Sequence, residues 1–234
     1  MKDIEFWFSI GSPYGYLSVM RLPRLQQETG VRVIWRPFPL RQIMIEMNNF
    51  PYLDKPAKVA YLWQDIARQA RKHGLSPNLP APFPLGGCDL ADRVALVAQM
   101  EGWIEPYVRQ SYLHWLHEGQ PAGAEPNLSH SILECRQDPD RVIATAEGGR
   151  IESVYQTALH EARERHIFGA PSFVVDGELF WGDDRLNDAI HAAMPAPRGA
   201  VVKKARPSPD PMPTGAPSVP AARTVRLRQP GRAG

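Results

Sequence analysis

The chain has 234 residues, 43% of them hydrophobic and 22% charged, which is the composition of a globular protein large enough to fold without a disulfide or metal. Its net charge of +2 is unevenly placed, since residues 195–234 carry eight Lys or Arg and one acid, and the mildly acidic remainder gives no support to nucleic-acid binding by the folded body. Two distant cysteines, Cys88 and Cys135, exclude a disulfide framework and argue against a thiol-disulfide active site, which needs a C-x-x-C pair.

The first 35 residues predict a β-α-β unit. Apolar residues alternate over residues 4–10, which is the period of a strand. Ser12 and Pro13 then fit the N-cap and first position of a helix that ends near Gly30, with a kink or break at Pro23. A second alternating run covers residues 31–35. The helical crossover makes the two strands parallel.

The middle of the chain, from about residue 42 to residue 165, carries almost entirely helical signals. The clearest helical periodicities lie around residues 58–68, 90–100 and 151–162. Residues 76–84, between the first two of these helical stretches, form an irregular loop that contains four prolines. This region therefore predicts an all-helical insertion.

The sequence that follows predicts a β-hairpin and a last helix. Two apolar runs, residues 173–175 and 178–180, are joined by Asp176-Gly177, the strongest short hairpin signal. Helical spacing then extends from about residue 182 to residue 193.

Together these elements predict an α/β protein with a thioredoxin-like fold and an inserted all-helical domain. The thioredoxin-like domain would be discontinuous, formed by residues 1–41 and 166–194, and the insertion would span residues 42–165. Residues 195–234 hold nine prolines and little apolar content, so we expect a disordered tail rich in Pro and Arg.

Ser12 has two interpretations that do not exclude each other. A serine before proline at a helix start is an ordinary N-cap. The carboxyl end of the first strand is also where α/β proteins bind ligands, and helix N–H groups there favour an anion. The Ser12 hydroxyl could donate a hydrogen bond to a bound thiolate and lower the pKa of that thiol.

Two further segments are candidates for ligand binding. Pro171 fits the start of a strand because proline cannot donate to a ladder, and a trans bond is the ordinary state. A cis bond would free the carbonyl and N–H of Ala170 for a peptide-like ligand. Asp183 and Asp184 fit N-caps of the last helix, or one of them could bind an α-amino group.

No metal site is predicted. His114 and His117 are three residues apart, but no motif supplies a third ligand, so they are interpreted as exposed helix histidines. The chain also lacks a G-x-G-x-x-G motif and a P-loop.

Two stretches resemble the motifs of a known family. Residues 6–17 (FWFSIGSPYGYL) are similar to the opening motif of the 2-hydroxychromene-2-carboxylate isomerases and their relatives, the kappa-class glutathione transferases. Residues 168–173 (FGAPSF) and 177–186 (GELFWGDDRL) resemble the closing motif of that family. The resemblance covers roughly residues 3–194 and implies a DsbA-like branch of the thioredoxin fold, glutathione as cofactor and a homodimer.

The resemblance also implies roles for individual residues. Ser12 would activate the glutathione thiol. Ala170 and Pro171 would hold the cysteinyl backbone, with Pro171 cis, and Asp184, with Asp183 beside it, would bind the γ-glutamyl end. The glycyl end would lie near Asn49 and Lys58.

The expected function is isomerisation of a small conjugated electrophile, a product of aromatic-ring degradation, by reversible addition of the glutathione thiolate. A glutathione transferase, a DsbA-type oxidoreductase and a non-catalytic glutathione-binding module are the alternatives. Ser12 and Gly15 stand at both cysteine positions of the redox motif, which weakens the oxidoreductase alternative. The N-terminus enters a strand directly and no apolar run reaches a membrane-spanning length, so we expect a cytoplasmic protein.

Overall fold

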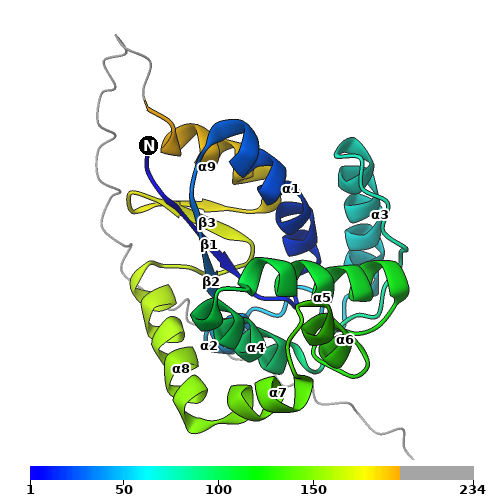
Figure 1. The fold of residues 1–234 in the computed structure, drawn as a ribbon. Coiled ribbons are helices and arrows are strands. Elements are labelled where there is room, and N and C mark those ends of the chain that lie inside the picture. Colours follow the sequence, from blue (N-terminus) through cyan, green and yellow to red (C-terminus); the bar gives the residue numbers. More distant parts are fainter. Residues whose placement is uncertain (196–234) are drawn as a thin grey trace, which may run out of the picture. The chain divides into compact units, whose positions relative to one another are not determined.

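The computed structural model describes residues 1–195, and Figure 1 shows its strands and helices. Within this range the strands form a four-stranded sheet in the order β2-β1-β3-β4. Strand β1 (Ile4–Phe8) pairs in parallel with β2 (Val33–Pro37) and antiparallel with β3 (Ser172–Val175), which pairs antiparallel with β4 (Glu178–Trp181). The predicted parallel pair and the predicted hairpin are confirmed.

The turn of the hairpin explains its sequence. Asp176 and Gly177 both adopt positive φ angles, 53° and 84°, as a two-residue turn that matches the twist of its strands requires. Glycine has no steric cost there, and aspartate tolerates the left-handed region.

Helices occupy the chain between and after the strands. Helix α1 (Pro13–Thr29) connects β1 to β2 and ends at Gly30, as predicted, but it continues through Pro23, so the predicted break is wrong. The 3-10 turn η1 (Asp183–Arg185) leads into α9 (Leu186–Ala193). The helices between β2 and β3 are α2 (Leu40–Glu46), α3 (Pro56–Lys72), α4 (Cys88–Glu101), α5 (Ile104–Glu118), α6 (Asn127–Glu134), α7 (Pro139–Glu147) and α8 (Gly149–Glu164).

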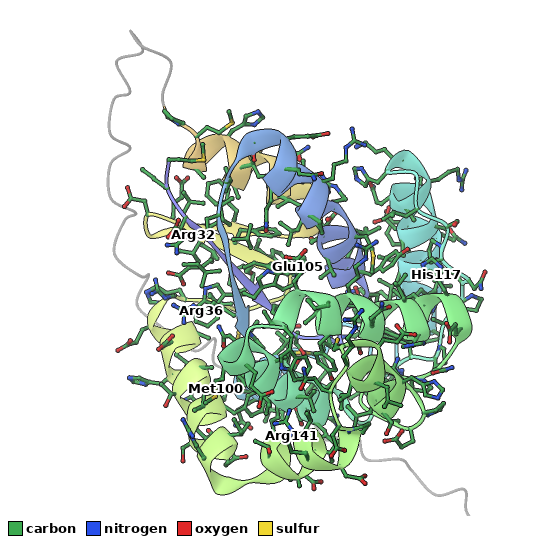
Figure 2. The ribbon with its side chains drawn as sticks, in the orientation of Figure 1. Arg32, Arg36, Met100, Glu105, His117 and Arg141 are labelled. Atoms are coloured by element: carbon green, nitrogen blue, oxygen red, sulfur yellow. The ribbon has the colours of Figure 1, made fainter. Side chains whose placement is uncertain are left out.

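Strand β1 is buried on both faces of the sheet. On one face Phe6 stacks on Phe8 and Phe173, at 5.1 and 5.3 Å between ring centroids, in the core that α1 and α9 share. On the other face Trp7 packs on Phe38 among residues of α2 and α8. Side chains fill the space between sheet and helices (Figure 2). The described residues belong to one compact unit, and the division into two domains stays a prediction.

The predicted disordered tail lies, from residue 196 onward, outside the described residues. Within residues 1–195 no helix is both long and apolar enough to cross a membrane.

A buried ion pair joins α1 to η1. Arg21 Nη1 donates to both carboxylate oxygens of Asp183, at 3.1 and 3.2 Å, and Ser18 Oγ donates to Oδ1 at 2.8 Å. Burial raises the pKa of Asp183, and the positive charge of Arg21 opposes that rise. Neither Asp183 nor Asp184 caps a helix with its side chain, so that interpretation is wrong: the Asp183 carboxylate is committed to α1.

This pair gives a test of the fold. Arg21→Met leaves the Asp183 carboxylate buried without its cation, so we expect the free energy of unfolding in urea to fall by about 3–5 kcal/mol. Arg24→Met is the matched control, because Arg24 and Glu28 form an exposed pair on the same helix. Equal losses in the two variants would contradict a stabilising role for the buried pair.

Candidate functional site

The site begins at the turn Ser9–Ser12, which leads from β1 into α1. Ser12 lies at the N-cap position and is 8% exposed, but its hydroxyl makes no capping hydrogen bond. Instead Ser12 Oγ donates to the carbonyl oxygen of Ala170 at 2.8 Å. The predicted N-cap is therefore right in position and wrong in its hydrogen bond, since a carbonyl distant in sequence takes the hydroxyl.

Helices of the insertion hold this turn in place. The Ser12 N–H donates to the Ser9 carbonyl at 3.1 Å. Tyr112, on α5, donates its hydroxyl to the Ser12 carbonyl at 2.9 Å and approaches the Ser9 carbonyl at 3.3 Å. Asp92, on α4, accepts the Ile10 N–H at 2.8 Å and the Ser9 hydroxyl at 2.7 Å. The turn is thus fixed from two helices.

The Tyr112 hydroxyl lies so close to Gly15 that it leaves no space for a side chain at that position. A Cβ atom at position 15 would overlap the Tyr112 oxygen, although Gly15 lies in the first turn of α1, where its φ angle is ordinary. A cysteine at this position, as a C-x-x-C pair needs, has no room. The Cys88 thiol, which lies against Gly11, is protonated at neutral pH because burial raises its pKa to about 12. These observations argue against thiol-disulfide chemistry at this turn.

The second wall of the site is the segment before β3. The Ala170-Pro171 bond is cis, as the resemblance implies. The Ala170 carbonyl accepts the Ser12 hydroxyl, so it is not free as a cis bond was expected to leave it. Within residues 1–195 the Ala170 N–H donates no hydrogen bond. Gly182 N–H donates to the Pro171 carbonyl at 2.9 Å and so holds the start of η1 beside this segment.

Asp183 and Asp184 differ sharply in environment. Asp183 is buried and paired with Arg21, whereas the Asp184 side chain is 72% exposed and pairs with Arg185 at 3.3 Å. The Asp184 carboxylate folds back over Gly182, whose φ of 108° and lack of a side chain leave room for it. Asp184 is therefore the acid of this pair that can meet a ligand.

Asn49 and Lys58 are both exposed. Asn49 follows α2, and Lys58 stands in the first turn of α3. Helix α3 is tied to α1 by Tyr14, whose hydroxyl donates to Asp65 at 2.9 Å. In the described part of the chain no hydrogen bond or ion pair links Asn49 or Lys58 to Ser12, whereas Ser12 and Ala170 are hydrogen-bonded.

Two groups of aromatic side chains are candidates for ligand contact. Phe83, in the predicted proline loop, meets Tyr52 and Trp63 edge to face, at 5.5 and 5.8 Å between ring centroids. Trp181, 54% exposed, meets Phe168 at 4.9 Å and lies over Gly169. The pair of Phe168 and Trp181 therefore provides apolar surface next to the segment that carries Ala170.

Sequence analysis missed Asp92 and Tyr112. Asp92 could have been noticed in the sequence, because it falls on the apolar face of α4 with Cys88, Ala91 and Ala95. An acidic side chain is rarely buried on such a face unless it has a polar partner. Tyr112 carried none, since an aromatic residue at helical spacing is ordinary core.

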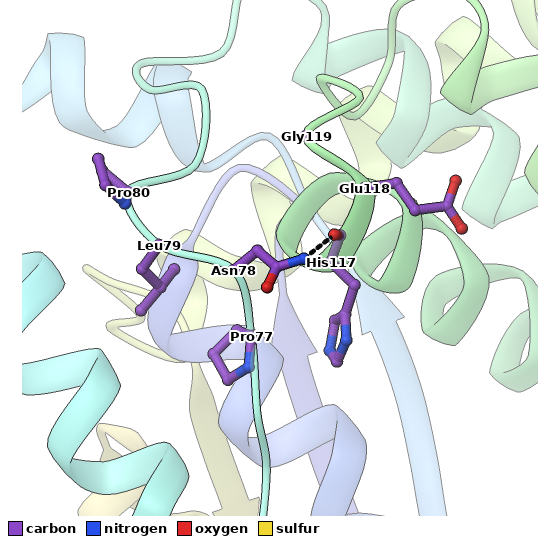
Figure 3. A pocket seen from close by; sticks show the side chains of 7 residues that line it. All are labelled: Pro77, Asn78, Leu79, Pro80, His117, Glu118 and Gly119. Atoms are coloured by element: carbon purple, nitrogen blue, oxygen red, sulfur yellow. Dashed lines mark hydrogen bonds between the residues drawn. The ribbon is translucent and has the colours of Figure 1, made fainter.

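A cavity of about 520 Å³ lies between the proline loop and the end of α5 (Figure 3). It is lined by Pro77, Asn78, Leu79, Pro80, His117, Glu118 and Gly119, none of them a predicted site residue. One of the lining residues, His117, stands at the C-terminal end of α5 (Figure 2), and its ring is hydrogen-bonded to the Tyr16 hydroxyl at 2.8 Å. Burial lowers the pKa of His117 and raises the pKa of Tyr16 to about 12.

The prediction of exposed helix histidines is wrong for both residues, since the His117 side chain is half-buried against Tyr16. His114 is buried, 5% exposed, and its Nδ1 lies 2.9 Å from Glu118, so it is not an exposed helix histidine. Among residues 1–195 no group of three or more His, Cys, Asp or Glu side chains is arranged to hold a metal ion.

Comparison with known proteins agrees with this geometry. The family model described as the DSBA-like thioredoxin domain matches residues 3–192. The chain is 28% identical to the 2-hydroxychromene-2-carboxylate isomerase of Sphingobium xenophagum, over 80% of this chain and 95% of that protein. It is 24% identical to the Pseudomonas putida protein of the same name, over 78% and 90%. It is also 22% identical to glutathione s-transferase kappa 2 of Caenorhabditis elegans, over 79% and 88%.

Solved structures give the same result. The structure of a 2-hydroxychromene-2-carboxylate isomerase superposes with a TM-score of 0.72 at 25% identity, and covers 81% of this chain and 93% of that one. A probable DsbA oxidoreductase from Streptomyces coelicolor superposes with a TM-score of 0.61 at 17% identity, which shows the shared fold. The DsbA-like thioredoxin fold and the family resemblance predicted from the sequence are confirmed.

The close approach of Gly15 and Tyr112 can be tested directly. Replacing glycine by alanine inside a helix ordinarily stabilises it by roughly 0.5–1 kcal/mol. For Gly15→Ala we expect instead a loss of about 1–3 kcal/mol in the free energy of unfolding, because the new methyl group overlaps the Tyr112 oxygen. Tyr112→Phe should remove most of that loss, since the next ring atom lies 3.3 Å from the added Cβ.

The matched control is Gly149→Ala, at the start of α8, where an added Cβ meets nothing within 4 Å. It should be neutral or stabilising. If Gly15→Ala changes the free energy of unfolding no more than Gly149→Ala does, the Tyr112 hydroxyl does not exclude a side chain at position 15.

Proposed function

The chain belongs to the DSBA-like thioredoxin family, and from that premise we propose that it is a glutathione-dependent isomerase acting on a small conjugated product of aromatic-ring degradation. The proposal rests on the position of the Ser12 hydroxyl. It lies at the N-terminus of α1, 2.8 Å from the carbonyl oxygen of Ala170, the residue before the cis proline Pro171. The relatives named 2-hydroxychromene-2-carboxylate isomerase support the reaction class.

The residues of the site fit glutathione by their chemistry. A peptide backbone needs an unpaired N–H, and the Ala170 N–H has no partner within residues 1–195. The α-amino group of the γ-glutamyl end needs a carboxylate, and Asp184 is exposed, whereas its neighbour Asp183 is buried and paired with Arg21. Ala170 and Pro171 would therefore hold the cysteinyl backbone and Asp184 the γ-glutamyl end.

The glycyl carboxylate needs a cation or an amide donor. Lys58 and Asn49 would supply them, since both are exposed and Lys58 forms no ion pair in the described part of the chain. Helix α3, which carries Lys58 in its first turn, is held to α1 by the hydrogen bond from the Tyr14 hydroxyl to Asp65, in the middle of α3.

Glutathione, when bound, supplies a thiolate that can add reversibly to a conjugated double bond. The chain's part is to favour that thiolate. The Ser12 hydroxyl can turn from the Ala170 carbonyl to an anion, and the N-terminus of α1 adds its positive dipole end. Lowering the thiol pKa by two units corresponds to about 2.7 kcal/mol, which one hydroxyl donor and a helix N-terminus can provide. The exposed aromatic side chains Phe168 and Trp181 offer surface for an unsaturated substrate.

A glutathione transferase is the second candidate, because a relative named glutathione s-transferase kappa 2 matches 79% of the chain. The same thiolate serves both reactions, and the product distinguishes them. We further propose that the protein is a homodimer, as the resemblance implies, and acts in the cytoplasm, where glutathione is kept reduced.

Glutathione binding is the first test. Calorimetry should show binding to the wild-type protein, and Asp184→Ala should weaken it by about 1–3 kcal/mol through loss of a charged hydrogen bond. Asp188→Ala is the matched control, because Asp188 is an exposed partner of the same Arg185. No heat at millimolar glutathione, with the wild-type protein folded, would refute the proposed function.

Ser12 tests the chemistry. Ser12→Ala should lower turnover by about tenfold or more, because it removes one hydrogen bond that favours the thiolate, and should leave glutathione affinity within a few-fold. It should also raise the pKa of the bound thiol, measured by thiolate absorbance. For an isomerase, glutathione is required and not consumed. A conjugate that accumulates in proportion to turnover would identify a transferase, and binding without any turnover would identify a binding module.

A further inference from the structure

Asp92 is a buried carboxyl that the proposed reaction does not use directly. It projects from α4 with 0% of its surface exposed and has both oxygens occupied by the turn that carries Ser12. Oδ1 accepts the Ile10 N–H at 2.8 Å, and Oδ2 is hydrogen-bonded to the Ser9 hydroxyl at 2.7 Å. These two residues come directly after β1, where the pairing with β2 ends at Phe8.

In residues 1–195 Asp92 forms no ion pair, and the groups that act most strongly on its carboxyl include no cation. From α4 itself come Asp89 and Cys88, from α5 Tyr107 and Tyr112, and from α8 Tyr155, whose hydroxyl donates to Asp89 at 3.2 Å. An ionised carboxyl without a cation is costly in a buried site. Burial accordingly raises the pKa of Asp92 well above its usual range, with Asp89 adding to the rise.

We propose that Asp92 is a positioning residue of the reaction, a protonated carboxyl that fixes the turn Ser9–Ser12 without adding a negative charge to the turn that carries Ser12. This inference rests on the proposed function, because it concerns the thiolate that Ser12 is proposed to favour. Asp92 touches no ligand and acts through Ser9, Ile10 and the backbone that follows them.

The neutral acid keeps both contacts. Oδ1 still accepts the Ile10 N–H, and the bond between Oδ2 and Ser9 reverses its direction, with the protonated Oδ2 donating to the Ser9 oxygen. An ionised carboxylate would hold the same turn equally well, but its charge would disfavour a thiolate at Ser12. A hydrophobic residue would avoid the charge but leave the Ile10 N–H buried without a partner. A neutral carboxyl meets both requirements at once.

A thiol placed at position 12 reports on this arrangement without glutathione. In a Ser12→Cys background, the pH dependence of iodoacetamide alkylation at position 12, mapped by mass spectrometry, gives the pKa of that thiol. Cys88 and Cys135 react slowly in comparison, because burial raises the pKa of their thiols to about 12 and about 11.

Two further substitutions separate charge from position. Asp92→Asn keeps the shape and an acceptor for the Ile10 N–H, so alkylation at pH 7 should stay within about twofold of the Ser12→Cys parent. Asp92→Ala releases the turn, so alkylation should slow by about tenfold, the effect of one pKa unit. If Asp92→Asn instead speeds alkylation about tenfold, Asp92 is ionised and the proposal is wrong.

Turnover gives the second measurement. Asp92→Ala in the otherwise wild-type protein should lower kcat by about tenfold with little change in KM for glutathione, and Asp92→Asn should restore most of it. Ser131→Ala is the matched control, since it removes a buried hydrogen bond to Asn127, at 3.2 Å, without touching Asp92 or the turn. If Asp92→Ala loses stability as Ser131→Ala does, with kcat and alkylation unchanged, Asp92 is merely structural and the proposal is overturned.

Ser9→Ala replaces Asp92→Ala if that variant does not fold. It removes one of the two hydrogen bonds of Asp92, so the alkylation rate at position 12 should fall, by less than is expected for Asp92→Ala. An unchanged rate would contradict the proposal. Should wild-type protein bind no glutathione, the proposed function fails while the alkylation series still reports whether Asp92 is neutral.

Discussion

The structure depends on how the buried backbone at the end of β1 is satisfied. Ladder pairing with β2 stops at Phe8, yet the turn that follows stays buried, and an unpaired buried N–H or carbonyl is costly. The helical insertion supplies the missing partners, a carboxyl from α4 and a phenol from α5. The insertion is therefore part of the site, although most of its residues are far from Ser12 in sequence.

The same requirement restricts the neighbouring positions. Once the Tyr112 hydroxyl binds the Ser12 carbonyl, position 15 can hold no side chain. Gly11 is similarly close to Cys88, whose Cβ lies 3.1 Å from the place of an added Cβ. The glycines of the opening motif thus reflect the approach of α4 and α5 to the turn, and their conformational freedom is secondary.

Local chemistry made much of this fold predictable. The Asp176-Gly177 turn, the start of α1 at Pro13 and the helical insertion follow from residues within a few positions of one another. The helix break at Pro23 was wrong, because tertiary packing of α1 maintains a helix that the missing N–H weakens. The hydrogen bonds of Ser12 and Asp183 were wrong because each side chain has a partner about 160 residues away. Such contacts exist only in the folded chain, and so do those of Asp92 and Tyr112.

Ser12 has a hydrogen bond before any ligand arrives, and this limits what it can contribute. The gain from donating to a thiolate is the difference between a charge-assisted bond and the existing bond to Ala170, and charge-assisted bonds are roughly twice as strong as neutral ones. A modest gain suits reversible chemistry, because a thiolate bound too tightly would add poorly to a double bond. The Ala170 carbonyl also gives the hydroxyl a place to return to when the thiolate leaves or reacts. An isomerase needs addition and elimination to be comparably easy, and a donor whose net gain at the thiolate is small favours elimination only slightly.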